Sequence, residues 1–299
     1  MHGAGNDFVM IDGFTREFDL APHQVQRICD RHFGIGGDGV IVVQRPKTVD
    51  TDGYMHYFNA DGTLAEMCGN GVRCAAKYLV DNELAGGDGH VTVGTLGGVK
   101  PIEYRVGING VEYATVNMGK PILTPEAIPI AAHADALTAN GQPYVRDRII
   151  KTPWGSVTFA AVSMGNPHAI WFLPELDTLP EELFPDGGER ALATMDISRI
   201  GPYLEKHPDF PQRTNIELAV VKNHSEVHIR VWERGVGETL ACGTGACAVA
   251  VASVLTEQTS RKADVHLPGG VLNIEWAESG EVLLGGLVAL TYTGEIELA

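Results

Sequence analysis

Two cysteines of this sequence stand in closely matching local sequences. Cys68 begins Cys-Gly-Asn-Gly over residues 68–71, and Cys242 begins Cys-Gly-Thr-Gly over residues 242–245. A thiolate is a base, and the corresponding thiol is an acid, so a positioned cysteine can move a proton. The duplication indicates that the same proton-transfer motif occurs twice in the chain.

A helix is predicted directly after each cysteine. Residues 72–80 repeat apolar side chains at three- and four-residue intervals, and residues 246–255 are apolar on almost every side, which predicts a helix buried all round. Each cysteine would then lie at a helix N-terminus. Unpaired backbone N–H groups and the helix dipole there can lower the pKa of a thiol and can also hold a carboxylate. Each copy would offer a base together with a cradle for an anion.

The repeat extends upstream of the cysteines. A strand predicted over residues 54–59 ends at Asn59, and a strand predicted over residues 227–231 leads to Glu233. Asn59 and Glu233 each precede the cysteine of their copy by nine residues. Strand, turn, cysteine and helix therefore recur together, which indicates two related halves.

The other predicted elements make strands the majority. A helix is predicted over residues 22–33, and residues 118–150, with three prolines, are expected to be a linker with excursions. The remaining strand candidates share apolar alternation and cover residues 40–43, 156–164, 169–172, 215–221, 265–276, 281–285 and 288–298. This pattern predicts an α+β fold.

Composition narrows the class of protein. The chain has 299 residues and a formal net charge of −16, which argues against binding to nucleic acid or to an anionic membrane surface. No apolar run approaches the roughly 20 residues of a membrane helix, and polar sequence rather than a secretory signal follows Met1. Five cysteines are an odd number in a chain large enough to need no disulfides. We expect a reduced, cytoplasmic protein with free thiols.

Several other motifs are better explained by a role in the fold than by a role in catalysis or binding. Cys29, Cys74 and Cys247 lie on predicted helix faces, where free cysteine is usually a small core residue. The glycine-rich residues 34–39 lack the Gly-Lys-Ser/Thr ending of a phosphate loop, which argues against nucleotide binding. His168 is expected to be a hydrogen-bonded supporting residue. No Cys-x-x-Cys occurs, so the cysteines are better interpreted as free thiols than as zinc ligands.

Motifs spread over most of the chain resemble those of the diaminopimelate epimerase family. They occur in the family's order and approximate spacing, at residues 1–12, 59–62, 68–74, 163–168, 233–239 and 241–245. The family inverts the α-carbon of an amino acid without pyridoxal phosphate, using one cysteine on each face. The resemblance thus implies no cofactor and no metal, and the epimerisation of LL-2,6-diaminopimelate to the meso isomer for lysine and peptidoglycan precursor synthesis.

The resemblance also implies the roles of individual residues. Cys68 and Cys242 would be the acid–base pair, and Glu233 and Arg234 would read the second amino and carboxylate groups of the substrate. The other implied substrate-binding residues are backbone groups and neutral side chains: Asn6, Asn59, Gly69, Asn70, Asn166, Asn215, Gly243 and Thr244.

The implied fold has two pseudo-symmetric domains. Each would be a curved mixed sheet, barrel-like around a central helix, with the active site in the cleft between them. Residues 1–120 would carry Cys68 and residues 121–286 would carry Cys242, while a C-terminal strand over about 287–299 would return to the first domain. A homodimer is implied by the family alone.

Two departures from the family pattern accompany this resemblance. Members usually have a short strand before the Met-His-Gly segment, whereas this sequence starts at Met1, so we expect either a trimmed start or a truncated first strand at the edge of the first domain. Thr63-Leu64 stands where many members carry Ser-Glu, and Gly39 stands where some carry glutamine, so substrate fit is expected to differ in detail.

Two alternative functions stay open from the sequence. One is a racemase of the same fold acting on another amino acid such as histidine. The other is a thiol- or metal-binding protein without catalytic activity.

Overall fold

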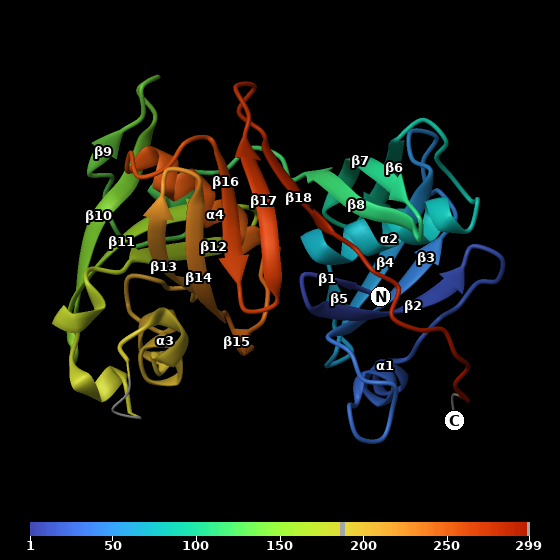
Figure 1. The fold of residues 1–299 in the computed structure, drawn as a ribbon, viewed down its shortest axis with the longest axis horizontal. Coiled ribbons are helices and arrows are strands. Elements are labelled where there is room, and N and C mark those ends of the chain that lie inside the picture. The colour runs from blue at the N-terminus through green and yellow to red at the C-terminus, as the bar shows by residue number, and fades with distance from the viewer. Residues whose placement is uncertain (186–188, 298–299) are drawn as a thin grey trace. The chain divides into compact units, whose positions relative to one another are not determined.

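The computed structural model describes residues 1–185 and 189–297 (Figure 1). Within them the protein is a strand-rich α+β protein with four α-helices and 18 strands, which confirms the predicted class. The chain divides into two compact units, which we call the first half (Met1–Met118 with Leu284–Ala299) and the second half (Gly119–Leu283). None of the described helices is long and apolar enough to cross a membrane.

The first half is a curved mixed sheet around helix α2 (Figure 1). Its elements in chain order are β1 (His2–Gly3), β2 (Asn6–Gly13), α1 (Pro22–Cys29), β3 (Gly39–Gln44), β4 (Gly53–Asn59), β5 (Leu64–Ala65), α2 (Gly69–Asp81), β6 (His90–Thr95), β7 (Gly98–Gly107) and β8 (Gly110–Asn117). The helix α2 packs against β1, β2, β3, β4, β6, β7 and β8, so it forms the core of this half.

The second half surrounds helix α4 in the same way. Its elements are β9 (Ala136–Leu137), β10 (Pro143–Thr152), β11 (Gly155–Ser163), β12 (Pro167–Phe172), α3 (Ile197–Glu205), β13 (Asn215–Asn223), β14 (Glu226–Glu233), β15 (Gly237–Thr239), α4 (Gly243–Leu255), β16 (Lys262–Leu267) and β17 (Gly270–Trp276). Four 3₁₀ turns cover Pro125–Ala127, Leu176–Thr178, Glu181–Leu183 and Leu192–Thr194, and strand β18 (Val282–Leu287) runs across the boundary between the halves.

The strand pairings of the two halves follow one scheme. In the first half β2 is parallel to β3, β3 is antiparallel to β4, β4 is parallel to β6 and β6 is antiparallel to β7. Strands β12, β13, β14, β16 and β17 repeat this order and these directions. The repeat predicted from the two cysteine motifs is confirmed by this topology.

Both central helices are buried, but their surfaces differ. The residues of α4 from Gly245 to Ser253 are all buried and none is charged, as predicted for a helix enclosed by apolar neighbours. Helix α2 instead buries Arg73 and Lys77. The Lys77 ammonium donates to two backbone carbonyls and pairs with Asp81, which offsets the cost of burying a charge.

Helix α1 ends earlier than predicted, at Cys29 rather than at residue 33. Its apolar face, Val25 and Ile28, packs on β3. The next residue, Asp30, has extended backbone angles, and its carboxylate accepts hydrogen bonds from the N–H groups of His32 and Phe33. This local turn competes with helix and stops it.

Helix α3 is absent from the sequence prediction. Its N-cap Asp196 accepts a hydrogen bond from the N–H of Ser198, but Gly201 and Pro202 lie inside the helix and conceal its periodicity. A Cβ on Gly201 would lie 2.5 Å from the Trp232 ring. Tertiary packing on this tryptophan therefore explains a glycine that helix propensity disfavours.

The structure corrects the predicted strand over residues 265–276 and the predicted linker over residues 118–150. Residues 265–276 lie in a hairpin of β16 and β17 rather than in one strand, because Pro268 and Gly269 form a two-residue turn between them. The supposed linker over 118–150 contains β9 and the start of β10.

The predicted C-terminal strand is also wrong over most of its length. Beyond β18, Ala289 forms a single bridge with His2, and residues 290–297 have no regular structure. Those residues are largely exposed, so the alternation of Thr, Tyr, Glu and Ile there finds no partner strand among the described residues. Residues 298–299 lie outside the described chain.

Candidate active site

Each of the two repeated cysteines caps a central helix. Cys68 and Cys242 are the N-cap residues of α2 and α4, and both have extended backbone angles. The sulfur of Cys68 accepts a hydrogen bond from the N–H of Gly71, and that of Cys242 from the N–H of Gly245, at 3.4 Å in both cases. The predicted position of the cysteines at helix N-termini is confirmed.

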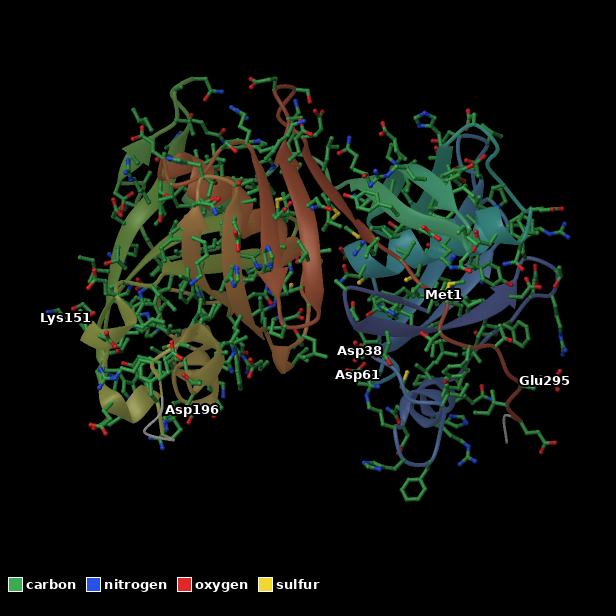
Figure 2. The ribbon with its side chains drawn as sticks, in the orientation of Figure 1. Met1, Asp38, Asp61, Lys151, Asp196 and Glu295 are labelled. Carbon is green, nitrogen blue, oxygen red and sulfur yellow. The ribbon has the colours of Figure 1, made fainter. Side chains whose placement is uncertain are left out.

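Asn6 and Asn70 surround Cys68 in the first half. The Cys68 thiol donates to Oδ1 of Asn6 at 3.6 Å, and Nδ2 of Asn70 donates to the same oxygen at 3.3 Å. The other end of the Asn6 amide donates to Asp38 at 2.6 Å; Asp38 is labelled in Figure 2. Asp38 thereby fixes the amide so that its oxygen faces the cysteine.

A buried cation supports this cluster. Arg73 is fully buried, and its guanidinium donates to Oδ1 of Asn70 at 2.6 Å and to the carbonyl of Gly69 at 3.3 Å. The bond to Asn70 orients that amide with its N–H group toward Asn6. Sequence reasoning missed Arg73, although a charged residue in an apolar helical run was an available signal.

Thr244 and Asn166 lie beside Cys242 in the second half. The Thr244 hydroxyl is 3.5 Å from the Cys242 sulfur, and Nδ2 of Asn166 donates to that hydroxyl oxygen at 3.3 Å. Because its oxygen accepts from Asn166, the hydroxyl hydrogen of Thr244 is available to the sulfur.

Glu233 affects the pKa of the Cys242 thiol. Burial raises the pKa of the Glu233 carboxyl, although hydrogen bonds from Thr239 (2.5 Å) and from the Cys242 thiol lower it in part. Burial, followed by the charges of Glu233 and Glu217, raises the pKa of the Cys242 thiol well above its usual value. The expected lowering by the helix N-terminus is therefore wrong for Cys242, since the bonds from Gly245 and Thr244 are outweighed. The raised pKa favours the thiol form of Cys242 over the thiolate.

This raised pKa predicts how Cys242 responds to alkylation. We expect its rate of labelling by iodoacetamide, followed by peptide mass spectrometry, to keep rising from pH 7 to pH 10, because only the thiolate reacts. Glu233→Gln removes one of the carboxylates that disfavour the thiolate, so this variant should label faster at any given pH. A rate that levels off below pH 9 in the wild-type protein would contradict the assignment.

A buried acid–histidine pair lies behind Cys242. His168 and Glu217 are both fully buried, and Nδ1 of His168 is 2.6 Å from Oε1 of Glu217. The Nε2 atom of the same ring is 3.0 Å from Oδ1 of Asn166. His168 is thus hydrogen-bonded, as predicted. Glu217 was missed, although a single acidic residue in the buried strand β13 was a signal.

The corresponding positions behind Cys68 are apolar. A Cβ on Gly245 would lie 2.8 Å from Oε1 of Glu217, whereas a Cβ on Gly71 would lie 2.9 Å from Cδ1 of Ile41 and 3.5 Å from the ring of Phe8. The strand registers agree, because Ile41 and Glu217 occupy matching places in β3 and β13. The two copies therefore share a backbone but differ in charge behind the sulfur.

The other predicted substrate-binding side chains are spread along the strand ends. Asn59 ends β4 and donates to the Thr63 hydroxyl at 3.0 Å. Asn215, buried at the start of β13, donates to the carbonyl of Pro167 and accepts from the N–H of Arg234 at 2.9 Å. The exposed Arg234 guanidinium contacts the carbonyl of Gln212 at 3.4 Å. Gly69 and Gly243 begin helices α2 and α4.

The remaining cysteines are core residues, as predicted. Cys29, Cys74 and Cys247 are buried, and burial raises the pKa of Cys29 to about 11 and that of Cys74 to about 12. One group among the described residues has metal-ligand spacing, and it contains Glu226, His228 and His266 but none of the cysteines.

Comparison with solved structures defines the class of fold. A probable proline racemase from Agrobacterium radiobacter K84 superposes with a TM-score of 0.64 and 13% identity, over 100% of this chain and 92% of that chain. A hydroxyproline epimerase from Agrobacterium vitis gives 0.63 and 13%, over 96% and 86%. The chain has the duplicated α+β fold that these two structures share.

The sequence comparisons place the chain within that class. The family model described as Diaminopimelate epimerase matches residues 1–124 and 160–290. A diaminopimelate epimerase from Leptospira biflexa is 41% identical over 100% of this chain and 98% of its own length. One from Desulfovibrio desulfuricans is 43% identical over 99% and 96%. The chain belongs to the diaminopimelate epimerase family.

Proposed function

We propose that this protein interconverts LL- and meso-2,6-diaminopimelate, in the synthesis of lysine and of peptidoglycan precursors. The observation that carries the proposal is the pair of cysteine N-caps on duplicated helices, in a chain that matches its relatives over its full length. Inversion at a carbon atom requires one group to remove a proton on one face and another to supply a proton on the opposite face. Cys68 and Cys242 are the proposed groups, and no cofactor is assigned a step.

The raised pKa of the Cys242 thiol favours one direction for the first proton transfer. With LL-diaminopimelate bound, a Cys68 thiolate would take the α-proton, and the Cys242 thiol would deliver its proton to the other face. The electron pair of the broken C–H bond is held on the α-carbon and carboxylate until the new C–H bond forms. Cys68 then carries the proton and Cys242 is the thiolate, so the reverse reaction begins with the roles exchanged.

Backbone groups at the two caps would stabilise the charge that develops on the α-carboxylate. The N–H groups around Gly69, Asn70, Gly243 and Thr244 lie at helix N-termini, where the dipole favours an anion. Acid–base transfer alone accelerates a reaction by roughly 10²–10⁴-fold. These preorganised donors must therefore account for much of the remaining lowering of the activation barrier. The arrangement of the two halves around the substrate stays a prediction.

The decisive experiment is proton exchange in D₂O. Reduced protein and LL-diaminopimelate, with no cofactor added, should lose the α-proton NMR signal while the meso isomer appears with deuterium at the inverted carbon. A folded, reduced protein that produces neither result would rule out this substrate. A panel of amino acids including histidine, and then metal analysis, would test the two alternative functions.

Arg234 provides a test of substrate specificity. We propose that its guanidinium binds the far carboxylate and that the asparagines complete the pocket. Arg234→Leu is expected to raise KM for diaminopimelate about 10- to 100-fold, the equivalent of one charge-assisted hydrogen-bonded pair, with a smaller change in kcat. An unchanged KM in steady-state assays would place the far carboxylate elsewhere.

Two properties of the whole protein are proposed on family grounds alone. We propose a homodimer, which light scattering of the purified protein tests, and a cytoplasmic location, which fractionation of the source cells tests.

A further inference from the structure

Three side chains that can bind a metal ion lie together on one face of the sheet in the second half. Strand β14 carries Glu226 and His228, and the adjacent parallel strand β16 carries His266, the direct partner of His228 (Figure 1). The neighbouring residues Val227 and Val265 are fully buried, so the three side chains lie on the opposite face from them. Each of the three is about one-third exposed, at 35–37%, and can be reached by an ion from solution.

The ligand atoms of these three residues converge. Oε1 of Glu226 is 2.7 Å from Nε2 of His228 and 3.9 Å from Nε2 of His266. The two imidazole rings are stacked, with 4.5 Å between their centroids and 8° between their planes. Ligand atoms around a tetrahedral zinc ion lie about 3.4 Å apart, because each is about 2.1 Å from the metal. Since the three ligand atoms already lie within 4.8 Å of one another, small side-chain rotations on a fixed backbone bring them around one ion.

Asn223 orients the carboxylate of Glu226. Nδ2 of Asn223 donates to Oε2 of Glu226 at 3.2 Å, while its Oδ1 accepts hydrogen bonds from the N–H and the hydroxyl of Ser225. A backbone N–H only donates, so this contact fixes which end of the amide faces the carboxylate. Oε1 is then directed toward the histidines. Carboxylates that bind metals are commonly held by such an outer hydrogen bond.

We propose that Glu226, His228 and His266 bind one divalent transition-metal ion, that Zn²⁺ fits the site best, and that water completes the coordination. Two imidazoles and one carboxylate are a ligand set that zinc uses in proteins. The ion joins β14 to β16, which are separated in sequence by helix α4. The site includes neither Cys68 nor Cys242, so the inference is independent of the proposed function. The simpler alternative, a carboxylate–imidazole pair on the protein surface, predicts no specific metal binding.

Calorimetric titration with Zn²⁺ tests the site in the full-length protein, purified without a histidine tag, treated with a chelator and kept reduced. We expect a site for one ion per chain. His228→Gln and His266→Gln should each weaken binding at this site about 100-fold or more, because loss of an outer hydrogen-bond partner alone costs about 10–100-fold. His224→Gln, which alters an exposed histidine in the turn before β14, is the matched control and should keep the wild-type Kd. No binding by the wild-type protein, or an unchanged Kd in both cluster variants, overturns the proposal.

Co²⁺ then identifies the atoms that hold the ion. Cobalt substitutes for zinc and absorbs visible light when bound, and thiolate ligands add strong sulfur-to-cobalt charge-transfer bands in the near ultraviolet. We expect visible absorption without these charge-transfer bands in the wild-type protein, and loss of that absorption in His266→Gln. Charge-transfer bands that persist in His266→Gln would place the ion at a cysteine and overturn the proposal. Neither measurement depends on catalytic activity.

Discussion

Replacing either Cys68 or Cys242 by alanine is expected to lower kcat for the epimerisation on the order of 10³-fold. Each cysteine performs one proton transfer in the proposed mechanism, and removal of a positioned acid or base costs roughly 10²–10⁴-fold. The loss should fall on kcat rather than on KM, because the backbone groups of Gly69 and Gly243, which are proposed to hold the carboxylate, remain. NMR assays of the LL and meso isomers measure both quantities.

The two alanine variants should differ in isotope exchange. Cys242→Ala retains the proposed base for the LL isomer, so we expect slow uptake of deuterium into LL-diaminopimelate without formation of the meso isomer. Cys68→Ala should show neither exchange nor inversion of the LL isomer. Cys29→Ala, which alters a buried core cysteine, is the control and should retain kcat. Normal turnover by Cys68→Ala would refute the mechanism with two cysteines.

Gly245→Ala is expected to be the second most damaging substitution, with kcat about 10²-fold lower. Neither Gly245 nor its counterpart Gly71 has a positive φ, so alanine is conformationally allowed at both sites. The new Cβ of Gly245→Ala would lie 2.8 Å from the buried Glu217 carboxylate and 3.3 Å from the Cys242 sulfur. Displacing these atoms by even a fraction of an ångström misaligns the sulfur, and 1 Å costs about 10²-fold.

Gly71→Ala is the matched comparison and should be milder. Its Cβ would approach Cδ1 of Ile41, which is the end of a flexible side chain that can rotate away. We expect kcat within about tenfold of wild type, since only the apolar packing behind the cap adjusts. Urea denaturation should also show a larger loss of unfolding free energy for Gly245→Ala, about 1–3 kcal/mol from overpacking. Equal effects of the two substitutions on kcat would contradict the difference between the two caps.

Features that depend only on neighbouring residues could be predicted from the sequence. The helices after Cys68 and Cys242, the cap position of each cysteine and the repeat of strand, turn and helix were all predicted correctly. Helix caps, turns and the spacing of apolar residues each involve fewer than ten consecutive residues. They can therefore be recognised in the sequence without knowledge of the fold. Helix α3 was not predicted, because Gly201 and Pro202 interrupt its local apolar pattern. Its packing on Trp232, which is distant in sequence, is not visible in that pattern.

The electrostatic surroundings of the two cysteine caps, in contrast, depend on residues that are brought together only in the folded protein. The two cysteine motifs are nearly identical, and each sulfur accepts one N–H hydrogen bond. Strands β2 and β3 bring Phe8 and Ile41 behind Cys68. Strands β12 and β13 bring His168 and Glu217 behind Cys242. The pKa of the Cys242 thiol is raised by burial and by carboxylates from two different strands. Burial and charge depend on residues far apart in sequence, and strand pairing is the physical event that brings them together.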